Sequence, residues 1–261
     1  MSKVESMRRD WDDRARKDPF FYIASWKSDW KLPEFFQSGE DDYGRLVAPI
    51  LEREGFYPAG RSMLELGCGV GRMTKAFAAR FAEVRAFDVS EEMLSRAKEL
   101  SVSATNISWV QANGKDLSCV PDESVDFVFS YLVLQHMPKK PLVFGIVQEM
   151  IRVVKPGGFC LFQFTGRSPA TMNLRGRMLW GWIDSLWTIG LRRFARETAR
   201  IAGLDPNMAG KTWHGSAIDA ATMAEVVAKC GCERIEIRDG GTPLAWCCAR
   251  KARVTQKAAG A

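Results

Sequence analysis

The stretch Met63-Leu-Glu-Leu-Gly-Cys-Gly-Val-Gly-Arg-Met73 decides the fold, because an apolar strand runs directly into a glycine-rich turn and then into a helix. Gly67, Gly69 and Gly71 let the backbone turn sharply and approach a ligand where a Cβ atom would clash. The helix that follows presents unpaired backbone N–H groups at its start. This order of strand, glycine loop and helix predicts a cofactor-binding loop in an α/β protein.

A second strand ends in a carboxylate farther along the chain. Residues 84–88 form a strand that ends in Asp88, which is expected at the carboxyl end of the neighbouring strand, where it can accept hydrogen bonds from the hydroxyls of an adenosine ribose. A dinucleotide site would need Gly-x-Gly-x-x-Gly, whereas here the third glycine comes one residue early. Glu65, directly before the loop, is a poor neighbour for a diphosphate and a better one for a zwitterionic amino-acid tail.

In these two motifs the chain resembles the class I S-adenosylmethionine-dependent methyltransferases. Their first motif is acid-x-Gly-x-Gly-x-Gly, and their second strand ends in the ribose-binding acid. The resemblance covers residues 60–165, includes the Val-x-Lys-Pro-Gly-Gly run that ends at Gly158, and resumes more weakly near residue 213. It implies a doubly wound, Rossmann-like α/β fold with a seven-stranded, mostly parallel sheet and an antiparallel last strand. It also implies methyltransferase activity with S-adenosyl-L-methionine as the cofactor.

The resemblance assigns a set of cofactor-binding positions. Met93 matches the family's Asp-x-Ser-x-x-Met pattern near the adenine, although core packing explains it equally well. Asn113 stands where relatives usually carry an acid; its amide oxygen can still accept from the adenine amino group, and the alternative is a simple Asn-Gly turn. Backbone groups of Ser130, at the end of the fourth strand, are expected at the methionine end. The full set is Glu65, Gly67, Cys68, Gly69, Gly71, Asp88, Val89, Met93, Asn113, Gly114 and Ser130.

His136 and His214 are the only two imidazoles in the chain and are the candidate catalytic residues. A general base is needed only if the acceptor must lose its proton before attack, as a hydroxyl usually does. A structural role is the alternative for each histidine. No metal site is expected, because the seven cysteines form no Cys-x-x-Cys pair and are read as buried thiols.

Composition divides the chain into five parts. Residues 1–45 are rich in aromatic side chains and cover an edge of the domain or form a wall of the substrate pocket. Residues 46–165 form the cofactor-binding core, residues 166–215 a helical cap insertion rich in Trp and Arg, residues 216–252 a helix and hairpin that complete the core, and residues 253–261 a flexible tail. We expect the first segment and the insertion to meet above the carboxyl ends of the strands.

The 261 residues carry a net charge of +6 and no stretch apolar enough to span a membrane, and the first residues show no secretion signal, so we expect a cytoplasmic protein. The leading hypothesis is methyl transfer to an oxygen or nitrogen of a small-molecule acceptor. An RNA or protein methyltransferase is the alternative, although no nucleic-acid recognition module accompanies the basic residues. A non-catalytic cofactor-binding protein is the third reading. The sequence does not define the oligomeric state.

Overall fold

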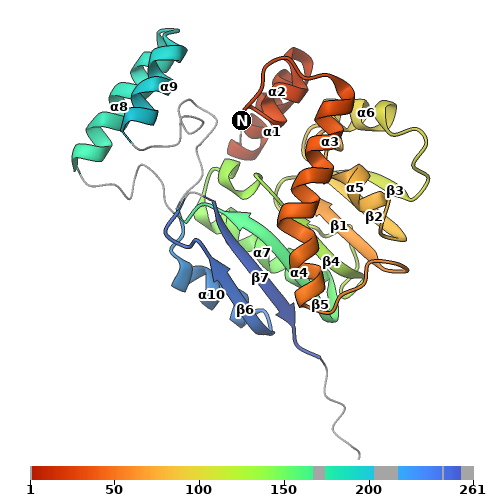
Figure 1. Cartoon of the computed structure of the whole chain (residues 1–261). Helices are drawn as coiled ribbons and strands as arrows, with labels where there is room; N and C mark the ends of the chain where they lie inside the picture. Colours follow the sequence, from red (N-terminus) through yellow and green to blue (C-terminus); the bar gives the residue numbers. More distant parts are fainter. Residues whose placement is uncertain (1, 167–173, 203–216, 243, 254–261) are drawn as a thin grey trace, which may run out of the picture.

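A seven-stranded sheet forms the centre of the computed structural model, which describes residues 2–166, 174–202, 217–242 and 244–253 (Figure 1). The strand order is β3-β2-β1-β4-β5-β7-β6. β1 to β5 pair in parallel, and β7 runs antiparallel to both of its neighbours. The predicted sheet is therefore confirmed. The strands are Ser62–Leu66 (β1), Glu83–Asp88 (β2), Ile107–Gln111 (β3), Val125–Ser130 (β4), Val154–Phe164 (β5), Cys232–Arg238 (β6) and Ala245–Lys251 (β7).

Helices cover both faces of the sheet, as the doubly wound fold requires. Every residue of β4 is buried, which is typical of a parallel strand packed on both faces. The helices α7 (Lys140–Val153) and α10 (Ala220–Lys229) bury one apolar side against one face. The helices α4 (Ala48–Arg53) and α5 (Thr74–Ala78) pack on the other, together with the π-helical turn Tyr43–Val47. None of the helices in the described residues is both long and apolar enough to cross a membrane.

The N-terminal segment lies beside the carboxyl ends of the strands. It consists of α1 (Lys3–Lys17), α2 (Pro19–Ile23) and α3 (Leu32–Asp42). α1 packs on α6 (Glu91–Leu100), where the Ser90 hydroxyl donates to Asp12 at 2.6 Å and Arg16 pairs with Glu92 at 2.8 Å. An apolar cluster that includes Phe35, Val70 and Met93 joins this segment to the core. The segment is thus attached by both polar and apolar contacts.

The insertion contains a helical hairpin, α8 (Leu174–Thr188) and α9 (Arg192–Ile201), whose buried contacts are between the two helices. In Figure 1 the hairpin stands away from the sheet. Its flanking residues, 167–173 and 203–216, and the tail from 254 onward lie outside the described residues.

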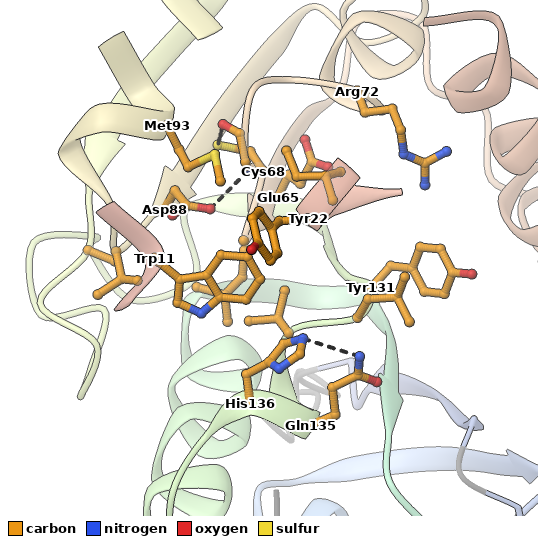
Figure 2. A pocket seen from close by; sticks show the side chains of 18 of the residues that line it. Trp11, Tyr22, Glu65, Cys68, Arg72, Asp88, Met93, Tyr131, Gln135 and His136 are labelled. Atoms are coloured by element: carbon orange, nitrogen blue, oxygen red, sulfur yellow. Dashed lines mark hydrogen bonds between the residues drawn. The ribbon is translucent and has the colours of Figure 1, made fainter. Parts of the chain in front are cut away.

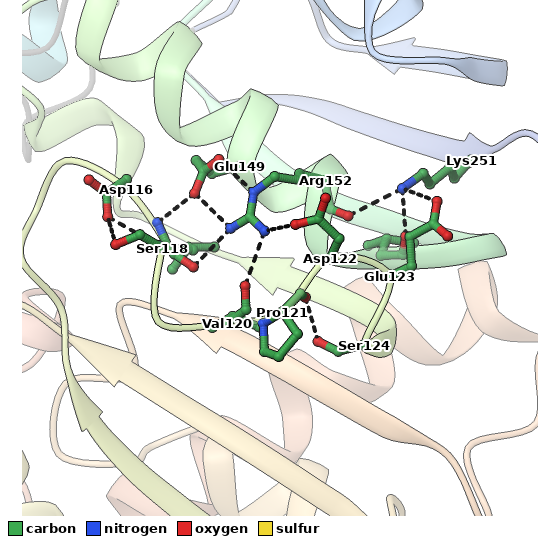
Figure 3. Close-up of polar contacts among 12 residues, drawn as sticks. Asp116, Ser118, Val120, Pro121, Asp122, Glu123, Ser124, Glu149, Arg152 and Lys251 are labelled. Atoms are coloured by element: carbon green, nitrogen blue, oxygen red, sulfur yellow. Dashed lines mark hydrogen bonds and ion pairs between the residues drawn. The ribbon is translucent and has the colours of Figure 1, made fainter.

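Arg152, on α7, fixes the connection between β3 and β4 (Figure 3). Its guanidinium donates to the carbonyl oxygens of Leu117 at 2.9 Å and Val120 at 3.1 Å, and it pairs with Glu149 at 2.7 Å. Glu149 in turn accepts from the Leu117 N–H at 2.9 Å. One ion pair therefore holds the loop that begins beside the carboxyl end of β3.

Replacing Arg152 with alanine removes the guanidinium that binds the carbonyl oxygens of Leu117 and Val120 and the carboxylates of Asp122 and Glu149. Because hydrogen bonds to charged groups contribute roughly 1.5 to 3 kcal/mol, we expect Arg152→Ala to lower the free energy of unfolding by about 2 kcal/mol, measured by urea denaturation. Lys229→Ala breaks only the exposed ion pair with Glu225 and should change the free energy of unfolding by less than about 0.5 kcal/mol. Equal, small effects of the two substitutions would contradict this role of Arg152.

Candidate active site

A cavity of about 320 Å³ opens at the carboxyl ends of β1, β2 and β4 (Figure 2). Its floor is the glycine loop after β1 and the end of β2. One wall comes from residues 112–116 and the segment after β4, and the other comes from α1, α2 and the turn that follows α2. The position agrees with the general location of ligand sites in open α/β sheets. No described residue of α8 or α9 lines the cavity.

Asp88 joins the two sides of the floor. One carboxylate oxygen accepts from the Gly69 N–H at 2.8 Å, and the other accepts from the Ser90 N–H at 2.9 Å. Burial raises the pKa of Asp88 to about 6, although the N–H groups of Ser90 and Gly69 act in the opposite direction. A carboxylate offers about four acceptor positions. The two backbone bonds therefore leave Asp88 able to accept from hydroxyls of a ligand in the cavity.

Glu65 is a second buried acid at the cavity. The Thr74 hydroxyl donates to one of its oxygens at 2.6 Å. Burial raises the pKa of Glu65 to about 7, the Thr74 bond and Arg72 oppose this rise, and the charge of Asp88 adds to it. Two desolvated carboxylates beside one cavity favour a ligand that brings hydroxyl or ammonium donors.

Positions 67 and 69 of the loop require glycine, because a side chain there would clash with other parts of the protein. Gly67 and Gly69 have φ of 79° and 55°, a region that other residues rarely adopt. A Cβ atom on Gly67 would lie 2.0 Å from Cγ2 of Val133, and one on Gly69 would lie 2.6 Å from Cδ1 of Ile23. The close approach at Gly69 is therefore to a side chain of α2, which covers the loop.

An aromatic group and an imidazole face the cavity opposite the loop. The rings of Trp11 and His136 meet edge to face, with centroids 5.1 Å apart. The guanidinium of Arg14 lies between the rings of Trp11 and Tyr22, at 5.0 and 5.1 Å from their centroids. Nε2 of His136 is 3.2 Å from the side-chain nitrogen of Gln135. The amide nitrogen can only donate, so Nε2 accepts in the tautomer that carries its proton on Nδ1.

The structure brings most of the sequence-predicted residues to this cavity, but not all of them. Those that line it are Glu65, Gly67, Cys68, Gly69, Asp88, Val89, Met93, Gly114 and His136. His214 lies outside the described residues. Gly71, Asn113 and Ser130 do not line the cavity.

The three residues outside the cavity have other contacts. The amide oxygen of Asn113 accepts from the N–H groups of Lys115 and Asp116 at 2.7 and 3.0 Å, so it serves the turn that was the alternative reading. Ser130 is fully buried and its hydroxyl donates to the Leu66 carbonyl oxygen at 3.1 Å. A Cβ atom on Gly71 would lie 2.9 Å from the ring of Trp109.

Among the polar residues at the cavity, the sequence does not predict Arg14, Ser25, Arg72, Asp116, Tyr131 and Gln135. Tyr131 follows β4 directly, and Gln135 precedes His136, so their proximity in sequence to predicted site residues was a usable signal. The sequence gives no such signal for Arg14, because Arg14 lies on α1, a helix that reaches the site only through long-range packing. Arg72 also serves the fold, since it is bound by Asp42 at 2.7 Å.

Comparison with known proteins identifies the class. Residues 64–162 match the family model described as a methyltransferase domain. A ubiquinone biosynthesis O-methyltransferase of Pseudomonas savastanoi is 31% identical over 159 residues, which are 60% of this chain and 65% of that protein. The biotin biosynthesis bifunctional protein BioHC of Cellvibrio japonicus is 33% identical over 52% of this chain and 25% of its own length. The matched part of the chain thus spans less than two thirds of the length of these relatives.

Solved structures agree with this class at the level of the fold. A magnesium protoporphyrin IX methyltransferase from Synechocystis with bound S-adenosylmethionine aligns with a TM-score of 0.59 at 13% identity, over 97% of this chain and 98% of that one. Phosphoethanolamine N-methyltransferase 1 of Haemonchus contortus gives 0.58 at 14% identity, over 97% of this chain and 50% of that one. Residues 64–162 of this chain thus match a methyltransferase domain, and the fold is shared with a methyltransferase whose bound cofactor is S-adenosylmethionine.

The cavity residues fit this cofactor. Asp88 retains acceptor capacity for ribose hydroxyls, and Glu65 presents a carboxylate beside the loop, suited to an ammonium group. Apolar side chains of Val89 and Met93 provide walls for a flat base. We assign the ribose to Asp88 and the amino-acid tail to the region of Glu65 as the working arrangement.

Asp88→Asn should lower the affinity for S-adenosylhomocysteine about ten- to a hundredfold, because a charge-assisted acceptor is lost. In the unchanged protein, protonation of Asp88 removes the same acceptor. Protonation of Glu65, whose pKa is about 7, removes the acceptor assigned to the amino-acid tail. Affinity should therefore fall as the pH drops first through this value and then through the pKa of about 6 of Asp88, and only the second fall should be absent from Asp88→Asn. Isothermal titration calorimetry at pH 5, 6 and 7.5 measures both effects.

Asp239→Asn is the matched control, because Asp239 is exposed at a φ of 54° that asparagine also adopts. It should bind like the unchanged protein at each pH. Unchanged affinity in a folded Asp88→Asn variant would refute the assignment of Asp88.

Proposed function

We propose that this protein transfers a methyl group from S-adenosylmethionine to an oxygen or nitrogen atom of a small, flat acceptor by in-line displacement. The observation that carries the proposal is one continuous cavity. It runs from Asp88 and the glycine loop to Trp11, Tyr22 and His136, and the chain's own N-terminal segment closes it. The cofactor end and the acceptor end are thus parts of one cavity.

The cover that α1 forms over one side of the cavity favours a small acceptor. α1 covers the cavity and is held to α6 through the Ser90–Asp12 hydrogen bond and the Arg16–Glu92 ion pair. An RNA or protein substrate would have to displace this helix or present a single extruded group. The arginines that suggested such a substrate cluster in α8 and α9, whose described residues do not line the cavity. A small molecule therefore has the stronger support.

The aromatic walls favour a flat acceptor, because rings stack or meet edge to face with a gain of about 0.5 to 1.5 kcal/mol beyond the area they bury. The names of two relatives fit this chemistry: the ubiquinone biosynthesis O-methyltransferase and a 2-methyl-6-phytyl-1,4-hydroquinone methyltransferase of Synechocystis, which is 33% identical over 39% of this chain and 31% of its own length. Phenols and hydroquinones are accordingly the first acceptors to test.

The bound cofactor supplies an electrophilic methyl group, so the protein has to orient the nucleophile and exclude water. Trp11 and Tyr22 would hold the ring of the acceptor. In the tautomer protonated on Nδ1, His136 would take the proton of an acceptor hydroxyl at Nε2 once its contact with Gln135 is exchanged for the substrate. An amine acceptor can attack as the neutral base and does not need this step.

A panel of phenols, hydroquinones and amines with methyl-labelled S-adenosylmethionine tests the proposal. His136→Gln should reduce kcat for a hydroxyl acceptor about a hundredfold or more, because general-base catalysis contributes roughly 10² to 10⁴. Its affinity for S-adenosylhomocysteine should stay within about twofold, in contrast to that of Asp88→Asn. No transfer to any member of the panel, or full kcat in His136→Gln, would count against the assigned chemistry.

The N-terminal segment should respond to the cofactor. Binding of S-adenosylhomocysteine should slow amide hydrogen exchange in α1 and α2 together with the glycine loop, because both line the same cavity. α10, which packs on the far part of the sheet, serves as the internal reference. Exchange in α1 and α2 that is insensitive to the ligand would reduce the segment to a cover of the domain edge.

A further inference from the structure

The hairpin of α8 and α9 exposes an unusual amount of apolar surface. Of the eleven large apolar side chains that are exposed in the described residues, six belong to this short segment. The relative exposure of Trp182 is 61% and that of Ile201 is 81%, so most of the surface of these two residues faces solvent. Contiguous exposed apolar surface of this kind marks an interaction site. The six are Met178, Trp182, Ile189, Leu191, Phe194 and Ile201.

The exposed side chains form two stripes. On α8, Met178 and Trp182 are four residues apart and lie on one side of the helix, and Ile189, seven residues farther on, directly follows the last residue of α8. On α9, Phe194 and Ile201 are seven residues apart and share a side in the same way. Both helices therefore carry exposed apolar side chains on one side.

The two stripes lie on the same side of the hairpin. The contact between the helices is made by Ile183 on α8 and by Ala195 and Ala199 on α9, all fully buried. Viewed along each helix axis from its N-terminus, the exposed stripe is rotated away from this contact by roughly a quarter to a third of a turn. The direction of this rotation is the same on both helices. Because the short connection between them makes the helices antiparallel, equal offsets bring both stripes to one face. We call it the hairpin face.

The hairpin is also strongly basic. Residues 174–202 contain six arginines against Asp184 and Glu197, a net charge of +4 out of the +6 of the whole chain. Arg175, Arg193 and Arg200 are exposed. Apolar and aromatic side chains next to arginine on short helices are the composition of segments that lie in the interface of an anionic bilayer.

We infer that the hairpin face binds an anionic lipid surface, with α8 and α9 lying in the plane of the membrane. The helices have 15 and 10 residues, whereas about 20 are needed to span a bilayer, so the contact is confined to the surface. Nucleic acid would use the arginines but would leave the stripes of Trp182 and Phe194 exposed to water, whereas the bilayer interface accommodates both. The inference rests on the hairpin alone and does not depend on methyl transfer.

Co-sedimentation of the full chain with vesicles tests the inference. The protein should pellet with vesicles of phosphatidylcholine and phosphatidylglycerol, less with phosphatidylcholine alone, and less at high salt. The double variant Trp182→Glu/Phe194→Glu should lower the partition coefficient about tenfold or more, because it removes two large apolar anchors and adds two negative charges. Calorimetry with S-adenosylhomocysteine should give unchanged affinity, which shows that the variant is folded and separates this test from that of the proposed function.

Tyr57→Glu/Val102→Glu is the matched control. It changes the charge equally and replaces two side chains that are just as exposed but lie outside the hairpin. It should bind vesicles like the unchanged protein. The inference is overturned if the unchanged protein stays in solution with anionic vesicles, or if both double variants bind alike. It is also overturned if the hairpin variant changes only cofactor affinity, which would make the hairpin face a cover for the cavity, or if only retention of RNA depends on the arginines.

Discussion

The bridge that Asp88 makes between two backbone N–H groups is the constraint on which the site depends. Through Gly69 it fixes the glycine loop after β1, and through Ser90 it fixes the start of α6. The Ser90 hydroxyl then accepts from the Met93 N–H, as an N-cap, and donates to Asp12 of α1. Three segments that are far apart in sequence are thus positioned by one carboxylate and the serine two residues beyond it.

This arrangement has an electrostatic cost that a ligand offsets. Asp88 and Glu65 are both desolvated, and the pKa of each is raised, to about 6 and about 7. A raised pKa means that the folded protein holds these groups in their charged form less favourably than water does. Hydroxyl and ammonium donors supplied by S-adenosylmethionine would compensate both carboxylates, so the same burial that destabilises their charged forms makes the cavity selective for such a ligand.

The sequence was sufficient to predict the core of the fold and the floor of the site, because both are encoded locally. The glycine positions, the acid at the end of β2 and the apolar strands are each legible from a few neighbouring residues. The contacts of Asn113 were less predictable: its amide oxygen could serve adenine or the turn, and only the local backbone geometry, which brings the N–H groups of Lys115 and Asp116 within reach, decides between them. Arg14 could not be foreseen, since its place at the cavity depends on how α1 docks.

The docking of α1 and α2 links the two ends of the cavity. Val4 and Ile23 contact the positions of Gly114 and Gly69 on the cofactor side, whereas Trp11 and Tyr22 lie toward His136. A single segment therefore covers both halves, and it cannot open over one while remaining closed over the other if it moves as a unit. Water exclusion at the acceptor is then tied to the contacts that α1 makes beside the cofactor, above all the Asp12–Ser90 hydrogen bond. The hydrogen bond that anchors α1 and the aromatic wall of the cavity therefore depend on each other, and both depend on Asp88 at the end of β2.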